Sequence, residues 1–169
     1  MLKFCKFMLG VAIISSAAAV PAHADAVVRV TLIDKSGMPD LSNSMRFGMG
    51  MHGDMKMARM GINISPKVVD RGKVRFDVTN IASKLVHEII HARIADENRV
   101  LSYNTVKNTV NEETLKTLGQ VAEIGPSKSA SITLELKPGK YILYCNIAGH
   151  YMAGMWTVIE VMQPWGRTA

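Results

Sequence analysis

The sequence predicts an all-β domain, built as a sandwich or barrel of short strands. Several segments are rich in β-branched residues or alternate apolar with polar residues, and turn-forming residues separate them. Two of these turns are clear, at residues 70–72 (Asp-Arg-Gly) and 137–140 (Lys-Pro-Gly-Lys). Short strands that alternate with such turns are typical of β-sandwiches and barrels.

The predicted strands follow from local patterns. Ala26–Asp34 is rich in β-branched residues, and Ile62–Val69 has strand character around Pro66, which indicates an edge strand or a bulge. Lys73–Asn80 alternates apolar with polar residues, so one of its faces is expected to be buried. The remaining predicted strands are Leu85–Ala95, Val121–Ile124, Ser129–Leu136, Tyr141–Cys145 and Met155–Met162.

One short helix is predicted in the long connection between residues 96 and 119. Asn111 suits its N-cap, and Glu112 and Glu113 suit a first turn, where negative charge is favourable. Gly119 suits the position after its last turn.

The N-terminus has the pattern of an export signal. Lys3 and Lys6 precede an apolar run over Met8–Val20, and residues 22–24 (Ala-His-Ala) form a small-residue cleavage site. The run is shorter than the roughly 20 residues of a membrane-spanning helix, which argues against an anchor. We therefore expect residues 1–24 to be a signal peptide and residues 25–169 a single domain in the periplasm.

Charge and cysteine content narrow the function classes further. The formal charge is +6, or +4 without Lys3 and Lys6, and no dense basic block points to nucleic acid. No later stretch is long and apolar enough to span a membrane. Cleavage removes Cys5, so Cys145 is the only cysteine left and cannot form an internal disulfide. The oligomeric state is left open.

The residues that carry chemistry are Cys145, His150 and Met155, which stand five residues apart in one short segment. A thiolate, an imidazole and a thioether suit one copper ion that alternates between Cu(I) and Cu(II). A blue-copper site needs a second histidine, and His87, near the start of a different predicted strand, is the natural candidate. Gly149 and Gly154 each precede a ligand and allow the backbone to turn sharply.

Two other interpretations of Cys145 and His150, and a possible further ligand, have less support in the sequence. Cys145 and His150 could be the nucleophile and base of a thiol hydrolase, but no further motif supports this reading. Zinc binds cysteine and histidine but rarely a thioether. His91 is expected to be structural, since four residues along an extended strand place it roughly 13 Å from His87.

A methionine-rich insertion occupies about residues 38–60. Thioethers are soft ligands that favour Cu(I) and bind it without losing a proton. The alternative is a flexible apolar filler that packs on the sandwich. The candidate secondary Cu(I) ligands are Met45, Met49, Met51, His52, Met55, Met57 and Met60.

These features resemble the cupredoxins, the plastocyanin, pseudoazurin and azurin group, from Ala26 to Met162. The Cys-x4-His-x4-Met spacing is similar to plastocyanin and pseudoazurin, and the extra methionines are similar to periplasmic copper-tolerance cupredoxins. The resemblance implies an eight-stranded Greek-key sandwich, a type 1 copper held by His87, Cys145, His150 and Met155, and a His150 edge near solvent. The chain departs from the family at Ala148, where many members have proline, and at Glu88, where azurin-like proteins have asparagine.

Two roles are compatible with this site. The first is copper handling or tolerance in the periplasm, which the methionine-rich insertion favours. The second is diffusible one-electron transfer, with a redox partner docking on an apolar patch near His150 formed by Ile147, Ala148, Tyr151 and Met152. An enzyme is not expected, because multicopper catalysis needs His-x-His clusters that the sequence lacks.

Overall fold

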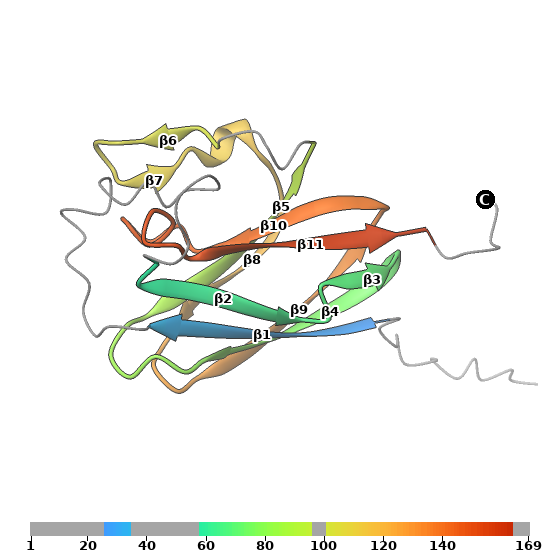
Figure 1. Ribbon diagram of the computed structural model, residues 1–169, viewed down its shortest axis with the longest axis horizontal. Coiled ribbons are helices and arrows are strands. Elements are labelled where there is room, and N and C mark those ends of the chain that lie inside the picture. Colours follow the sequence, from blue (N-terminus) through green and yellow to red (C-terminus); the bar gives the residue numbers. More distant parts are fainter. Residues whose placement is uncertain (1–25, 35–57, 96–100, 164–169) are drawn as a thin grey trace, which may run out of the picture.

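Two β-sheets form the body of the protein in a computed structural model that describes residues 26–34, 58–95 and 101–163. Figure 1 shows the sheets as two layers, with a small hairpin beside one end of them. The first sheet has the order β2-β1-β4-β9, where β1 and β4 are parallel and the other neighbours antiparallel. Its strands are β1 (Ala26–Asp34), β2 (Met60–Ser65), β4 (Gly72–Asn80) and β9 (Ser129–Leu136).

The second sheet has the order β3-β11-β10-β5-β8, and only β3 and β11 are parallel. Its strands are β3 (Val68–Asp70), β5 (His87–Ile94), β8 (Lys116–Ile124), β10 (Gly139–Tyr144) and β11 (Trp156–Met162). The chain crosses repeatedly between the sheets, as expected for a Greek-key sandwich. The all-β prediction is confirmed.

The main core lies between the sheets and comes from alternating strand residues. Val74, Phe76 and Val78 of β4 are fully buried, which confirms the predicted buried face. Every other strand of the two sheets also contributes buried residues to this cluster, including Met60 of β2, which is fully buried. This core holds the strand ends that carry the candidate ligands.

A second apolar cluster covers the outer face of β5 and β10. It contains Ile90, Ile142, Tyr144 and Tyr151, and the hairpin of β6 (Tyr103–Asn104) and β7 (Thr109–Val110) packs over it. The sequence did not predict this hairpin. Its strands are two residues each, too short to produce a recognisable alternating pattern.

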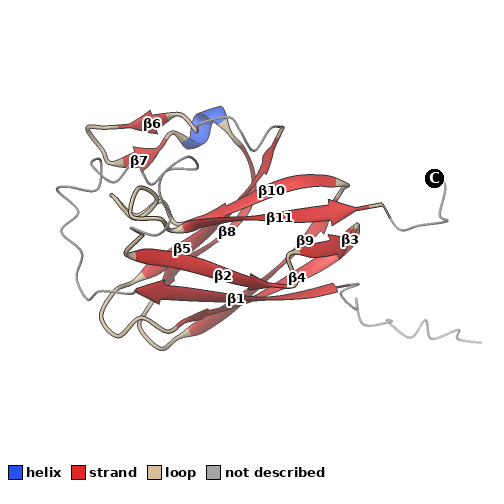
Figure 2. Cartoon of the chain, in the orientation of Figure 1, coloured by secondary structure: helices blue, strands red, loops and turns tan. Residues whose placement is uncertain are grey.

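Two other local predictions need correction. The expected helix is only a three-residue 3-10 helix, Glu112–Thr114, and the Asn111 side chain makes no cap hydrogen bond. Gly119 does not end a helix; it lies within β8, which begins at Lys116 and pairs with β5. Figure 2 shows this short helix among the strands. Among the described residues, no helix is long and apolar enough to cross a membrane.

The predicted strand around Pro66 is divided between the two sheets. β2 ends at Ser65 in the first sheet, and β3 begins at Val68 on the edge of the second. Both strands lie at the edge of their sheets, so the prediction of an edge position is correct for β2 and β3. The predicted signal peptide, residues 1–24, lies outside the described residues, as does the methionine-rich insertion up to residue 57.

Gly154 offers a direct test of how the loop before β11 packs on the first sheet. A Cβ atom there would lie 2.5 Å from the Ala58 Cβ, and the φ angle of Gly154 is +100°. We predict that Gly154→Ala lowers the free energy of unfolding by about 2–4 kcal/mol, through backbone strain and overpacking. Chemical denaturation measures this value. Gly61→Ala, whose Cβ would have no neighbour within 4 Å, is the control and should change stability far less.

Candidate metal centre

Three ligand atoms converge at one end of the sandwich. Cys145 Sγ lies 3.3 Å from His150 Nδ1, and His87 Nδ1 lies 3.2 Å from the same nitrogen. All three ligand atoms lie within 4.8 Å of one another. A first-row metal bonded to nitrogen at about 2.0 Å and sulfur at about 2.3 Å holds such donors about 3.3–3.7 Å apart. Two of the three donor pairs therefore lie close to the spacing that a single bound ion requires, and the third pair lies within 4.8 Å.

The segment between β10 and β11 is closed by its own backbone hydrogen bonds. Cys145 N donates to Met155 O at 3.1 Å, and Met155 N donates to His150 O at 3.0 Å. These bonds bring together three residues that are five and ten positions apart. Gly149 and Gly154 have φ angles of +82° and +100°, which confirms that both turns use glycine's conformational freedom.

His87 is the first residue of β5 and lies outside the segment that carries the other three candidate ligands. The turn before it is set by Asn80, whose Nδ2 donates to Leu85 O and Ile124 O at 2.8 Å each. Asn80 Oδ1 accepts the N–H of Ala82 at 2.9 Å, so this fully buried amide is satisfied on both sides. These hydrogen bonds hold the backbone of the turn that leads to His87.

Asn146 connects the segment after Cys145 to the β6–β7 hairpin. Its Oδ1 accepts the Val110 N–H at 2.6 Å, and its Nδ2 donates to Val110 O and to Glu112 Oε1. Its backbone N–H donates to Glu88 Oε1 at 3.0 Å. Glu88 thus accepts a backbone hydrogen bond next to Cys145.

Sequence reasoning missed the roles of Asn80 and Asn146. An asparagine beside an apolar strand is the only local signal, and it does not identify the backbone groups that the amide meets. Their partners include residues 44 and 36 positions away, respectively.

The site is buried. His87, Cys145 and Met155 are fully buried, and His150 is 4% exposed. Burial lowers the pKa values of His87 and His150 to about 4 and raises the pKa of Cys145 to about 12. Without a metal, the imidazoles are therefore neutral and the thiol is protonated at neutral pH. A metal ion must displace the thiol proton when it binds.

The structure also shows where the other residues named in the sequence analysis lie. His91 lies in the core with its ring centroid 4.4 Å from that of Phe76, outside the cluster of ligand atoms. Tyr151 was expected on the apolar surface patch, but it is only 2% exposed and packs against Tyr144 and Tyr103. Ile147 and Met152 are half-buried and Ala148 is exposed.

Of the candidate secondary Cu(I) ligands, only Met60 lies within the described residues, where it belongs to the core. The other six lie outside the part of the chain that the structure describes; they are Met45, Met49, Met51, His52, Met55 and Met57.

The buried histidines predict a pH dependence of stability. His87, His91 and His150 have folded-state pKa values of about 4, against 6.5 for the exposed side chain. Between these pH values the unfolded chain binds more protons, so the free energy of unfolding of the metal-free protein should fall as pH falls from 6.5 to 4. Partial burial raises the pKa of half-buried Glu88, and this opposes part of the fall. Chemical denaturation at each pH measures it.

The control for this prediction is His91→Phe, which removes one titrating ring outside the ligand set. The fall in stability between pH 6.5 and pH 4 should become shallower in this variant. An unchanged slope, or stability that increases toward pH 4, would contradict the assignment of neutral buried histidines.

Comparisons with known proteins agree with this architecture. The Sulfocyanin (SoxE) domain model matches residues 92–165, which include Cys145, His150 and Met155 but not His87. A search of curated protein sequences found no match. Auracyanin B is similar in structure, with 17% identity, a TM-score of 0.51, and coverage of 85% of this chain and 93% of that chain. Reduced rusticyanin is also similar, with 14% identity, a TM-score of 0.50, and coverage of 83% and 81%.

At these identities the structural likeness establishes the fold, and the chemistry of the site rests on the residues themselves. A buried thiol, two imidazoles and a thioether form the donor set that a single copper ion accepts in its blue form. The chain has the cupredoxin fold, and its closely grouped His87, Cys145, His150 and Met155 fit one type 1 copper site.

Proposed function

We propose that this protein is a mononuclear type 1 copper protein whose ion alternates between Cu(I) and Cu(II). Its ligands are His87, Cys145, His150 and Met155, and bound copper supplies the one-electron chemistry. The observation that carries the proposal is the convergence of three buried ligand atoms within 4.8 Å of one another. Buried soft and borderline donors of this kind suit copper in both oxidation states.

The proposed role is one-electron transfer rather than catalysis. His87 stands at the start of β5, Cys145 follows β10 and Met155 precedes β11, so strand ends hold three of the four ligands. Such a frame keeps the ligands in place while the charge of the ion changes, which lowers the reorganisation that electron transfer requires. The four buried side chains leave little room for a substrate, which supports a carrier without enzymatic activity.

A redox partner would dock beside His150. This ligand is the most exposed of the four, at 4%, and its neighbours Ile147, Ala148 and Met152 reach the surface. An apolar contact there brings the partner close to the ion without exposing it. We place the protein in the periplasm, because the predicted signal peptide of residues 1–24 would direct export and be removed from the domain of residues 25–169.

Copper handling is the second candidate role, and one observation favours it. The methionine-rich insertion lies in sequence between the described residues Asp34 and Met60, and these two residues are partners in the β1–β2 pairing. The N–H groups of Arg59 and Met60 both donate to Ala153 O in the ligand loop. Both ends of the methionine-rich insertion therefore join the domain next to the proposed copper site. A deletion strain that is sensitive to copper but respires normally would support this role over electron transfer.

The copper assignment predicts an intense visible absorption band. Adding Cu(II) to the metal-free protein should produce a sulfur-to-copper charge-transfer band, and Cys145→Ser should abolish it, because the thiolate supplies the electron density. A one-electron reductant should bleach the band and an oxidant should restore it. His91→Phe is the control and should retain the band. A colourless Cu(II) complex of the unaltered protein would refute the type 1 assignment.

The copper-handling role predicts more than one Cu(I) equivalent per chain. Anaerobic titration with Cu(I) should show one tight site and further weaker binding by the methionine-rich insertion. Replacing Met45, Met49, Met51, Met55 and Met57 with leucine should leave only the tight equivalent, since leucine keeps the apolar volume but has no donor. Met60 is kept because it packs in the core. Saturation of the unaltered protein at one equivalent would contradict this role.

A further inference from the structure

The end of the sandwich farthest from the proposed copper site, here called the distal end, is set by strand register. In the first sheet, Ala26 is paired with Val74, and Gly72 with Leu136. In the second sheet the corresponding pairs are Met162 with Asp70, Gly139 with Val161, and Arg93 with Lys116. In Figure 1 the distal ends of β1, β3, β10 and β11 lie at the right, opposite the ligand loop between β10 and β11.

Basic side chains gather at the distal end. Lys73 and Lys140 are there, but each stands opposite a glutamate on the neighbouring strand, Glu135 and Glu160 respectively. Asp70 is the other acidic residue at this end within the described chain. Five more basic residues, all exposed, give this end a formal charge of +4; they are Lys67, Arg71, Arg93, Lys116 and Lys137.

The end of the sandwich near the proposed copper site, here called the copper end, has a different balance of basic and acidic residues. Arg59, Lys84, Lys107 and Lys128 lie near it among the described residues, and five acidic residues offset them: Asp34, Glu88, Glu112, Glu113 and Glu123. The described domain is therefore polarised, with positive charge concentrated away from the metal. A uniformly basic surface would not produce this asymmetry.

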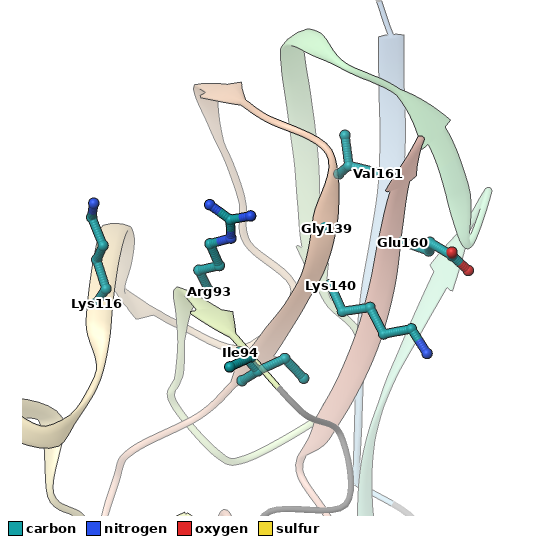
Figure 3. Close-up of a pocket in the computed structure, with 8 residues that line it drawn as sticks. Arg93, Ile94, Lys116, Gly139, Lys140, Glu160 and Val161 are labelled. Atoms are coloured by element: carbon teal, nitrogen blue, oxygen red, sulfur yellow. The ribbon is translucent and has the colours of Figure 1, made fainter. Parts of the chain in front are cut away.

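The distal end also has a groove and exposed apolar side chains. Arg93, Lys116 and Lys140 line a groove with a volume of about 550 Å³. Figure 3 shows Arg93 and Lys116 extending in the same direction beside Gly139, with Glu160 on the other side of β10. Val68 and Met162, on the paired strands β3 and β11, are 47% and 42% exposed. Cations beside exposed apolar groups suit a surface of anionic headgroups over acyl chains.

We propose that the distal end is a docking surface for an anionic phospholipid membrane. Arg93 and Lys116 would bind lipid phosphates, while Val68 and Met162 would contact the boundary of the acyl chains. The exposed apolar side chains of Val68 and Met162 among these cations support a membrane rather than an acidic protein as the partner. Docking in this way directs the copper end toward the aqueous compartment.

Vesicle co-sedimentation of the copper-loaded protein, purified after export, tests this surface. The protein should bind vesicles that contain phosphatidylglycerol, bind pure phosphatidylcholine vesicles far less, and lose binding as salt is raised. Lys67→Gln, Lys116→Gln and Lys137→Gln combined should weaken partitioning on the order of a hundredfold, since each cation contributes about fivefold. The visible copper band should be unchanged, because none of these residues approaches the ligands.

A matched variant separates the effect of where the lysines lie from the effect of the net charge of the protein. Lys84→Gln, Lys107→Gln and Lys128→Gln combined remove the same charge from the copper end and should leave binding within about twofold of the unaltered protein. Equal losses in the two triple variants would overturn the proposal, as would equal binding to neutral and anionic vesicles. Binding to soluble polyglutamate with none to anionic vesicles would instead assign the surface to an acidic protein.

Discussion

Closure of the segment between β10 and β11 is the constraint on which the rest of the structure depends. The bonds from Cys145 N to Met155 O and from Met155 N to His150 O fold the eleven residues from Cys145 to Met155 back onto themselves. Three residues whose side chains differ in softness as ligands are thereby brought together. The fourth, His87, is held independently by the buried Asn80 amide at the start of β5. Preorganisation of this kind removes an ordering cost that the ion would otherwise have to offset.

Local sequence patterns predicted much of the fold because the strands of a sandwich alternate in burial. The bounds of β1 and β9 agree with the predicted Ala26–Asp34 and Ser129–Leu136. β8 was predicted too short, because Gly119 resembles a helix end in sequence yet pairs with His91 across the sheet. Strand pairing is a tertiary property, and in this case it overrides the local preference of a glycine.

The candidate ligands could be found from sequence because their spacing and residue types are both restrictive. The residues that hold these ligands in place could not be found from the sequence. Asn146 bonds to Val110 and Glu112, and this network exists only because the β6–β7 hairpin crosses the outer face of the second sheet. The burial of Tyr151 has the same origin, since Tyr103 of that hairpin stacks on it. A contact between a loop and a hairpin about forty residues earlier leaves no periodic signal in either segment.

Burial of Cys145 has two opposing chemical consequences. It raises the thiol pKa to about 12, so the metal-free side chain is almost entirely protonated at neutral pH. The thiolate is the form that oxidants attack, so burial protects the Cys145 side chain from oxidation. The same burial makes loss of the thiol proton unfavourable in free energy. Only a metal with high affinity for sulfur can offset this unfavourable term when it binds. Copper meets this requirement better than harder divalent ions, so the environment of one thiol both preserves the empty site and selects the ion that fills it.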